Sequence, residues 1–443
     1  MFNILQKLKK LSAVTIGSLI FIIIAVVSFI IIFFWNYNYP VNNERKIYFV
    51  DNISQAHRDV IARFNALHKG DIKVEVINLP FEKFSTNERK ELLARYLRSK
   101  NDKIDIFTAD QIWAHRFARW AEPLDKYFTD NDKKIILKYA LQSCIYKNQM
   151  VAVPFFMDIG VMYYRKDLIE KLPDYKNIEK KLSESITWED FIKLGERINK
   201  SGSPFYTFQA DNYEGLMCSY IELLAEQNKS LFENDSAQLT SQESLRALNL
   251  LVDLVNKYHL STPKVTEFKE NNSYHYFITN NGLFVRAWPN FPRDYVASYG
   301  KDPRINELVK VPLPHFAGCR PVAITGGWNL MISKYSIRKP EAIEFVKYLM
   351  SDEAQKIMYE EGGYLPTNNV IYDDSVFTMK YPELKFFKNY LKSGVHRPYL
   401  VEYTRISDIV THFIQLAIKK EMSVRDALQK SQDMVNDKRF YIN

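Results

Sequence analysis

The chain has 443 residues, of which 47% are hydrophobic and 25% charged, and its formal net charge is +8. This composition is typical of a folded protein, and the length exceeds what a single core usually holds, so two domains are expected. Basic pairs such as Lys133-Lys134 lie among acidic residues and form no continuous stripe, which argues against a nucleic-acid partner. Cys144, Cys218 and Cys319 allow one disulfide at most, and their spacing suggests no metal site.

Residues 1–43 predict a membrane anchor and linker. Lys7, Lys9 and Lys10 precede an uncharged apolar stretch at residues 11–35. At about 1.5 Å per residue, a helix of this length spans a bilayer core of roughly 30 Å. The stretch is longer than the apolar region of a secretory signal and lacks a small-residue cleavage site. We therefore expect an uncleaved transmembrane helix with the rest of the chain outside the cytoplasm, and a long cleaved signal peptide is the alternative.

After residue 45, short apolar strands alternate with amphipathic helices. The expected strands are 46–50, 72–77 and 104–108, and the expected helices between them are 54–67 and 81–98. Such alternation is typical of βαβ units and predicts an α/β fold with a mainly parallel sheet. Ligands bind such sheets at the carboxyl ends of the strands. Because the third strand leads into Asp110 and Trp113, this loop is a candidate binding loop.

A second series of elements begins near Pro154. Expected strands are 161–164, 282–287 and parts of 308–334, and expected helices are 166–172, 188–199, 213–226, 242–258, 340–350, 352–361, 405–418 and 424–435. No internal repeat is found. The sequence also lacks the G-x-S-x-G, P-loop and H-E-x-x-H motifs of common catalytic sites.

Five segments resemble the family 1 extracellular solute-binding proteins, the sugar-binding components of ABC importers. They occur in the family's order: residues 104–110 with Trp113 and 122–124, then 154–168, 187–191, 326–330 and 362–367. Residues 213–216 and 287–289 look most like the maltose/trehalose-binding branch. The resemblance covers about residues 46–440.

The resemblance implies a two-lobed periplasmic-binding-protein fold of type II, with a ligand cleft and a hinge. Carried over to this chain, the first lobe holds 44–153 and 308–352, and the second holds 154–307 and 353–443. Lobes of this kind close around their ligand. The implied partners are a sugar, a membrane permease and a separate ATPase, and no cofactor or enzymatic activity is implied.

The resemblance also points to polar site residues, each with a purely structural alternative. Asp110 is expected in the cleft of the first lobe, although Asp also favours a helix N-cap. Asp158 lies in an apolar run, where it either faces the ligand or acts as a hydrogen-bond hub at the hinge. Glu214, after Tyr213, is a sugar ligand or only a favourable charge at a helix N-terminus.

Aromatic rings cover the apolar faces of sugars, so tryptophan and tyrosine complete the predicted site. Trp288 ends a predicted strand before Pro289, and Trp328 follows the scarce glycine pair Gly326-Gly327, which predicts a positive φ or a close backbone approach. The full predicted ligand-binding set is Asp110, Trp113, Asp158, Tyr213, Glu214, Trp288, Gly326, Gly327, Trp328 and Tyr364. Trp113 is equally a core candidate.

The expected function is capture of a disaccharide such as trehalose or maltose for a membrane permease. A glycoside hydrolase also needs carboxylates in a sugar cleft, but no compelling acid pair is evident. A tethered sugar sensor would need a signalling partner. Glycerol phosphate or another polyol phosphate is the alternative ligand, for which Arg286 and Arg320 are available near the suspected site.

Overall fold

The computed structural model describes residues 13–38, 44–80, 86–100, 102–198, 204–233 and 236–437. These residues fall into two compact units, one within Met1–Arg45 and His68–Lys73 and the other within Lys46–Leu67 and Val74–Asn443. The three lysines expected before the membrane helix lie outside the described residues.

The apolar N-terminal stretch forms helix α2, Ala13–Asn38, which has 26 residues and no charged side chain. Its described side chains, from residue 17 to 32, are all exposed. Over the described residues, no helix meets the length and apolarity required of a membrane span. The structure therefore does not support the predicted transmembrane helix.

The first sheet contains six strands in the order β14-β13-β3-β1-β2, with β6 also paired to β13. The strands are β1 (Arg45–Asp51), β2 (Ile72–Asn78), β3 (Ile106–Asp110), β6 (Val153–Ile159), β13 (Ala323–Ile332) and β14 (Gly394–Val395). β1 and β3 are parallel, whereas β13 runs antiparallel to both β3 and β6. The sheet is thus mixed rather than mainly parallel, because the long strand β13 returns through it from a distant part of the chain.

The second sheet has the order β12-β7-β11-β8. Its strands are β7 (Val161–Arg165), β8 (Tyr206–Thr207), β11 (Phe284–Ala287) and β12 (Leu308–Val311). β7 pairs antiparallel with both β11 and β12, and β8 is parallel to β11. β11 ends directly before Trp288-Pro289, as the sequence predicts.

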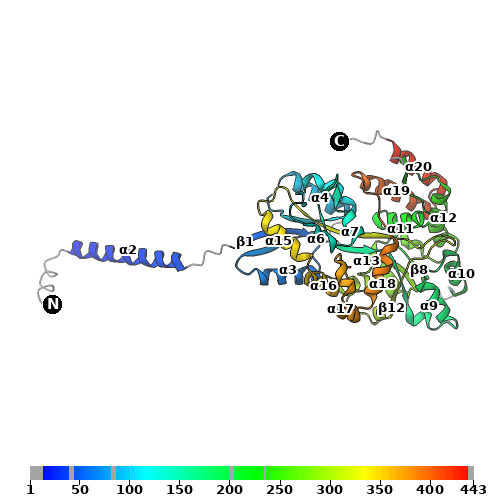
Figure 1. Ribbon diagram of the computed structural model, residues 1–443, viewed down its shortest axis with the longest axis horizontal. Helices are drawn as coiled ribbons and strands as arrows, with labels where there is room; N and C mark the ends of the chain where they lie inside the picture. Colours follow the sequence, from blue (N-terminus) through cyan, green and yellow to red (C-terminus); the bar gives the residue numbers. More distant parts are fainter. Residues whose placement is uncertain are drawn as a thin grey trace. The chain divides into compact units, whose positions relative to one another are not determined.

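Helices lie around both sheets (Figure 1). Near the first sheet are α3 (Gln55–Leu67), α4 (Thr86–Arg98), α15 (Lys339–Leu349) and α16 (Asp352–Gly362). The part of the chain around the second sheet includes α9 (Tyr175–Ser183), α10 (Trp188–Ile198), α11 (Glu214–Ala225), α12 (Gln242–Asn256), α13 (Glu270–Thr279), α14 (Phe291–Tyr299), α19 (Tyr403–Ile418) and α20 (Val424–Asn436). α17 (Ser375–Lys380) and α18 (Glu383–Tyr390) precede β14. The core under these helices is largely aliphatic and aromatic, with Phe49, Phe64, Phe155 and Phe191 fully buried.

The chain passes from the first sheet to the second at Gly160, between β6 and β7. The Gly160 N–H donates to the Ile324 carbonyl at 2.9 Å, and the Gly160 carbonyl accepts from the Tyr390 hydroxyl at 3.0 Å. A Cβ at this position would lie 2.3 Å from Glu222 Oε1, so any larger residue would displace the Glu222 carboxylate. Two segments lie in a different sheet from the one that the predicted lobes would give them. Residues 154–159, predicted in the second lobe, belong to the first sheet, and β12, predicted in the first lobe, belongs to the second sheet.

Candidate functional site

A buried arginine joins carboxylates from distant parts of the chain. Arg397, which follows β14 and is 4% exposed, donates to Asp110 Oδ1 and to Glu214 Oε1, each at 2.8 Å. Asp110 ends β3, and its side chain also caps the next turn by accepting from the Ile112 N–H. Glu214 begins α11 and accepts further hydrogen bonds from the hydroxyls of Tyr403 and Ser407. Two predicted site residues are thus linked through a third that the sequence did not reveal.

Trp328 on β13 is backed by a second arginine. The Arg89 guanidinium lies over the Trp328 ring, 4.7 Å from its centroid. Arg89 Nη2 donates to Asp51 Oδ1 at 3.2 Å, and both side chains are buried. Burial alone would raise the pKa of Asp51, but hydrogen bonding to His57 and the charges of His57 and Arg89 outweigh it and lower that pKa. Asp51 therefore stays ionised and holds Arg89 under the indole.

Trp288, after β11, has the same arrangement in the second sheet. The Arg286 guanidinium lies 4.7 Å from the centroid of the Trp288 ring. Arg286 in turn makes a bidentate pair with Glu222, with N–O distances of 2.9 and 3.1 Å. Both indoles remain partly exposed while the charged pairs behind them are buried. Each sheet thus presents one tryptophan whose orientation is fixed by an arginine and a carboxylate.

Asp158 lies close to the second indole. It pairs in register with Gly326 of β13, and a Cβ on Gly326 would contact both Asp158 Cβ at 3.4 Å and the Trp288 ring at 3.5 Å. Within the described residues Asp158 Oδ1 is buried without a hydrogen-bond partner. Burial, with the nearby carboxylates of Asp294 and Asp110, raises the pKa of Asp158 well above its ordinary value. This geometry favours the ligand-facing interpretation over a structural hydrogen-bond hub.

Gly327, the second residue of the glycine pair before Trp328, has both the predicted positive φ and the predicted close backbone approach. Its φ is +134°, and a Cβ would lie 2.3 Å from the Phe156 carbonyl oxygen. A side chain here would meet rigid backbone, so glycine is required both for the dihedral and for the close strand approach. The register of β13 against β6 shifts immediately afterwards, between Trp328 and Asn329.

The remaining predicted aromatic residues are more buried. Trp113 is 3% exposed and packs edge-to-face against Trp328 with ring centroids 6.0 Å apart, which agrees with its core alternative. Tyr364 is 7% exposed and lies 4.4 Å from the Phe156 ring. Tyr213 is partly exposed, and its ring lies 5.9 Å from the Lys269 ammonium. Trp113 and Tyr364 therefore support the site from behind in this structure.

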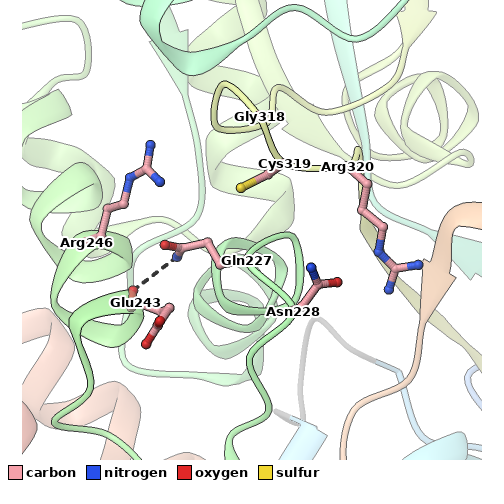
Figure 2. Close-up of a pocket in the computed structure, with 7 residues that line it drawn as sticks. All are labelled: Gln227, Asn228, Glu243, Arg246, Gly318, Cys319 and Arg320. Atoms are coloured by element: carbon pink, nitrogen blue, oxygen red, sulfur yellow. Dashed lines mark hydrogen bonds between the residues drawn. The ribbon is translucent and has the colours of Figure 1, made fainter.

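A separate surface hollow of about 520 Å³ contains none of the predicted sugar ligands. It is lined by Gln227, Asn228, Glu243, Arg246, Gly318, Cys319 and Arg320 (Figure 2). Arg320, one of two candidates for binding a phosphate, lines this hollow, and the other, Arg286, is 1% exposed and paired with Glu222. Neither arginine is therefore a free cation at the tryptophan site.

The described residues contain no His, Cys, Asp or Glu cluster that could hold a metal ion. All three cysteines have free thiols. The one disulfide that the sequence would allow is thus not formed. The site contains only hydrogen-bonding side chains, ion pairs and aromatic rings.

Sequence reasoning missed Asp51, Arg89, Arg397 and Glu222. Asp51 is the last residue of β1, and Arg89 lies in the first turn of α4. Neither residue belongs to a sequence motif that indicates a binding site. Arg397 lies in a segment without regular structure, 287 residues from the aspartate that it contacts. A signal was available only for Asp51, which ends a strand of a sheet whose ligands are expected at strand ends.

Two sheets that are joined at Gly160 and that each present an indole backed by a buried ion pair define a two-lobed binding protein. The chain belongs to the bacterial extracellular solute-binding protein family, whose model matches residues 50–356. A probable ABC transporter-binding protein from Deinococcus radiodurans is 26% identical over 364 residues, covering 80% of this chain and 84% of that protein.

Solved structures show the same fold. Maltose-bound MalE3 of T. maritima superposes with a TM-score of 0.80 at 25% identity, covering 90% of this chain and 100% of that chain. An ABC transporter solute-binding protein from Thermotoga lettingae, bound with α-D-tagatose, has a TM-score of 0.75 at 22% identity, covering 89% and 98%. These relatives are transport proteins and not enzymes. The chain is accordingly a substrate-binding component of an ABC transporter, and its family acts outside the cytoplasm.

Proposed function

We propose that this chain captures a neutral sugar, with a disaccharide such as maltose or trehalose as the leading candidate, and delivers it to an ABC permease. One observation carries the proposal: each sheet supplies one partly exposed indole, and each indole is backed by a buried arginine–carboxylate pair. Two indoles from two lobes suit a ligand with two apolar ring faces, because aromatic rings stack on such faces with little loss of conformational freedom. The maltose bound to MalE3 is consistent with this choice.

The charges of the site favour a neutral ligand over a polyol phosphate. Arg89, Arg286 and Arg397 each form an ion pair with at least one buried carboxylate. A phosphate would have to compete with these carboxylates for the guanidinium groups. Sugar hydroxyls instead both donate and accept, and hydrogen bonds to ionised carboxylates are stronger than neutral ones.

The proposal is tested by thermal unfolding of the full-length chain in a sugar-free detergent. The panel contains maltose, trehalose, tagatose, mannitol, ribitol and glycerol 3-phosphate. A ligand present at 100 times its dissociation constant stabilises the folded form by about 2.7 kcal/mol and raises the midpoint. A shift with a disaccharide supports the proposal, and a shift with glycerol 3-phosphate alone contradicts it.

Two variants connect the shift to the site. Trp288→Ala removes one stacking surface and is expected to weaken sugar binding, so the shift at a fixed sugar concentration becomes smaller. Tyr299→Ala is the matched control, because Tyr299 is an exposed aromatic side chain on α14 of the same part of the chain, 43% exposed. An equal loss in both variants would show that the effect is unrelated to the proposed platform.

Anchoring of the chain to the membrane remains a separate part of the proposal. Its support is the uncharged apolar sequence of residues 11–35 after three lysines, together with exposed apolar side chains such as Phe21 and Ile32 on α2. Alkaline carbonate extraction of membranes tests it, with Ile23→Lys/Ile24→Lys as the control expected to be released. Release of the unaltered chain by carbonate would refute the anchor.

A further inference from the structure

Arg286 and Glu222 form a deeply buried ion pair at the site, with side chains 1% and 8% exposed. Taking two charges out of water costs several kcal/mol each, so a buried pair adds little to stability compared with an apolar pair of similar volume. Its geometry is nevertheless highly defined, since two guanidinium nitrogens contact the two carboxylate oxygens. Stability alone therefore does not account for the pair.

One end of the pair fixes the Trp288 indole. Arg286 covers one face of the ring at 4.7 Å, and the indole Nε1–H points to Glu270 Oε1 at 3.4 Å. The far edge of the ring lies beside Gly326, where a Cβ would be 3.5 Å away. Arg286, Glu270 and Gly326 thus occupy one face, the N–H and one edge of the Trp288 indole. We therefore assign the ligand to the opposite face of the ring.

The Glu222 end of the pair contacts the crossing strands, namely β6 and β7 on either side of Gly160 and β13, which follows the connection from β12. Glu222 Oε1 also accepts from the Ile324 N–H at 3.2 Å, at the start of β13. Gly160, the crossing point between β6 and β7, lies against the same oxygen, and its N–H is bonded to the Ile324 carbonyl. The Tyr390 hydroxyl joins Gly160 to the connection between β12 and β13, because it donates to the Gly160 carbonyl and accepts from the Leu313 N–H, each at 3.0 Å.

We propose that Arg286 and Glu222 are positioning residues for sugar binding, which hold the Trp288 indole in its stacking orientation and tie it to the crossing strands at Gly160 and Ile324. Neither residue touches the ligand. They act through Trp288, so that the ring is already ordered before a sugar arrives. This inference rests on the proposed function, because it assigns the ligand-facing surface to Trp288.

The first test is a double-mutant cycle on the full-length chain with whichever panel sugar stabilises it. Arg286→Met/Glu222→Met replaces the pair by apolar side chains of similar length and leaves no unpaired buried charge. Sugar affinity is expected to fall about fivefold, the size of effect associated with ordering one side chain on binding. In a Trp288→Ala background the same double substitution should change affinity by less than about twofold. An equal loss in both backgrounds would overturn the proposal.

The second test needs no ligand. The chain is labelled with 5-fluorotryptophan, and the Trp288 fluorine signal is assigned from Trp288→Phe. Arg286→Lys keeps the charge but loses the planar, bidentate contact, so the Trp288 signal is expected to shift and broaden while that of Trp120 does not. An unchanged Trp288 signal would overturn the proposal. If no panel sugar binds, the proposed function fails, whereas this measurement still decides whether Arg286 orders the ring.

Discussion

Glu226, the residue after α11, is a carboxyl group held in an unfavourable environment. It is 2% exposed, and its Oε2 accepts from the Phe316 N–H at 3.2 Å. In the described structure Oε1 is buried without a hydrogen-bond partner. Burial is the main cause that raises the pKa of Glu226 from its ordinary 4.5 to about 8, against smaller lowering effects of Phe316, Trp188 and Arg246. Replacement by Gln keeps the size and an acceptor oxygen but removes the titration.

The sign and size of the pH effect follow from this pKa. The native carboxyl keeps its proton up to about pH 8, whereas the unfolded carboxyl loses it near pH 4.5. Because the native state binds more protons in this window, stability is greatest below pH 4.5 and is lost as the pH rises through 8. Since each pKa unit corresponds to roughly 1.4 kcal/mol, the loss of stability between pH 5 and pH 7 is about 2–3 kcal/mol. A further, smaller loss of about 1 kcal/mol follows by pH 9.

Urea unfolding at pH 5, 7 and 9 and constant ionic strength measures this effect as a difference between variants. Other groups titrate equally in both proteins, so the stability of the unaltered chain relative to Glu226→Gln should fall by about 2–3 kcal/mol from pH 5 to pH 7. The exposed Glu184→Gln is the matched control and should follow the unaltered chain at all three values. Parallel pH profiles for the unaltered chain and Glu226→Gln would refute the reasoning.

Three further outcomes are expected. Gly327→Ala forces a Cβ to within 2.3 Å of the Phe156 carbonyl and should cost about 3 kcal/mol or more in urea unfolding, whereas Gly300→Ala, with φ +84° and open space, should cost about 1 kcal/mol. Asp158→Asn removes a buried carboxyl whose Oδ1 has no partner in the described residues, so it should raise the ligand-free thermal midpoint while weakening sugar binding about tenfold, as measured by calorimetry. Arg397→Met leaves two carboxylates without their cation and should lower stability by about 3–5 kcal/mol in urea unfolding.

Much of the fold could be predicted because periodicity is a local property. Helices α3, α12, α19 and α20 lie within about two residues of their predicted ends, since their apolar stripes are long. Strand β14 has two residues and α13 and α14 lack a clear stripe, so no local pattern indicated them. The predicted lobe boundary at Pro154 falls within β6, because β6 and β7 form one apolar run and only their pairing with different strands separates them.

Candidate site residues could be predicted where the neighbouring sequence itself indicates the local backbone geometry. Trp288 stands at a strand end before proline, and Trp328 follows a glycine pair whose second member has the expected positive φ. Asp110 was expected as either a cap or a cleft residue, and the structure shows one side chain that both caps a turn and meets Arg397. These residues carry local signals because backbone geometry and sequence are directly connected there.

The charged residues behind the site could not be predicted in the same way, and the reason is energetic. A buried arginine is tolerated only where a carboxylate lies within reach, and that partner can come from any part of the chain. Arg397 depends on Asp110 and Glu214, which precede it by 287 and 183 residues. Because the same guanidinium neutralises two carboxylates that a sugar could use, its presence sets how much negative charge the site retains. The charge balance on which the proposed neutral sugar depends is therefore established only when the chain folds.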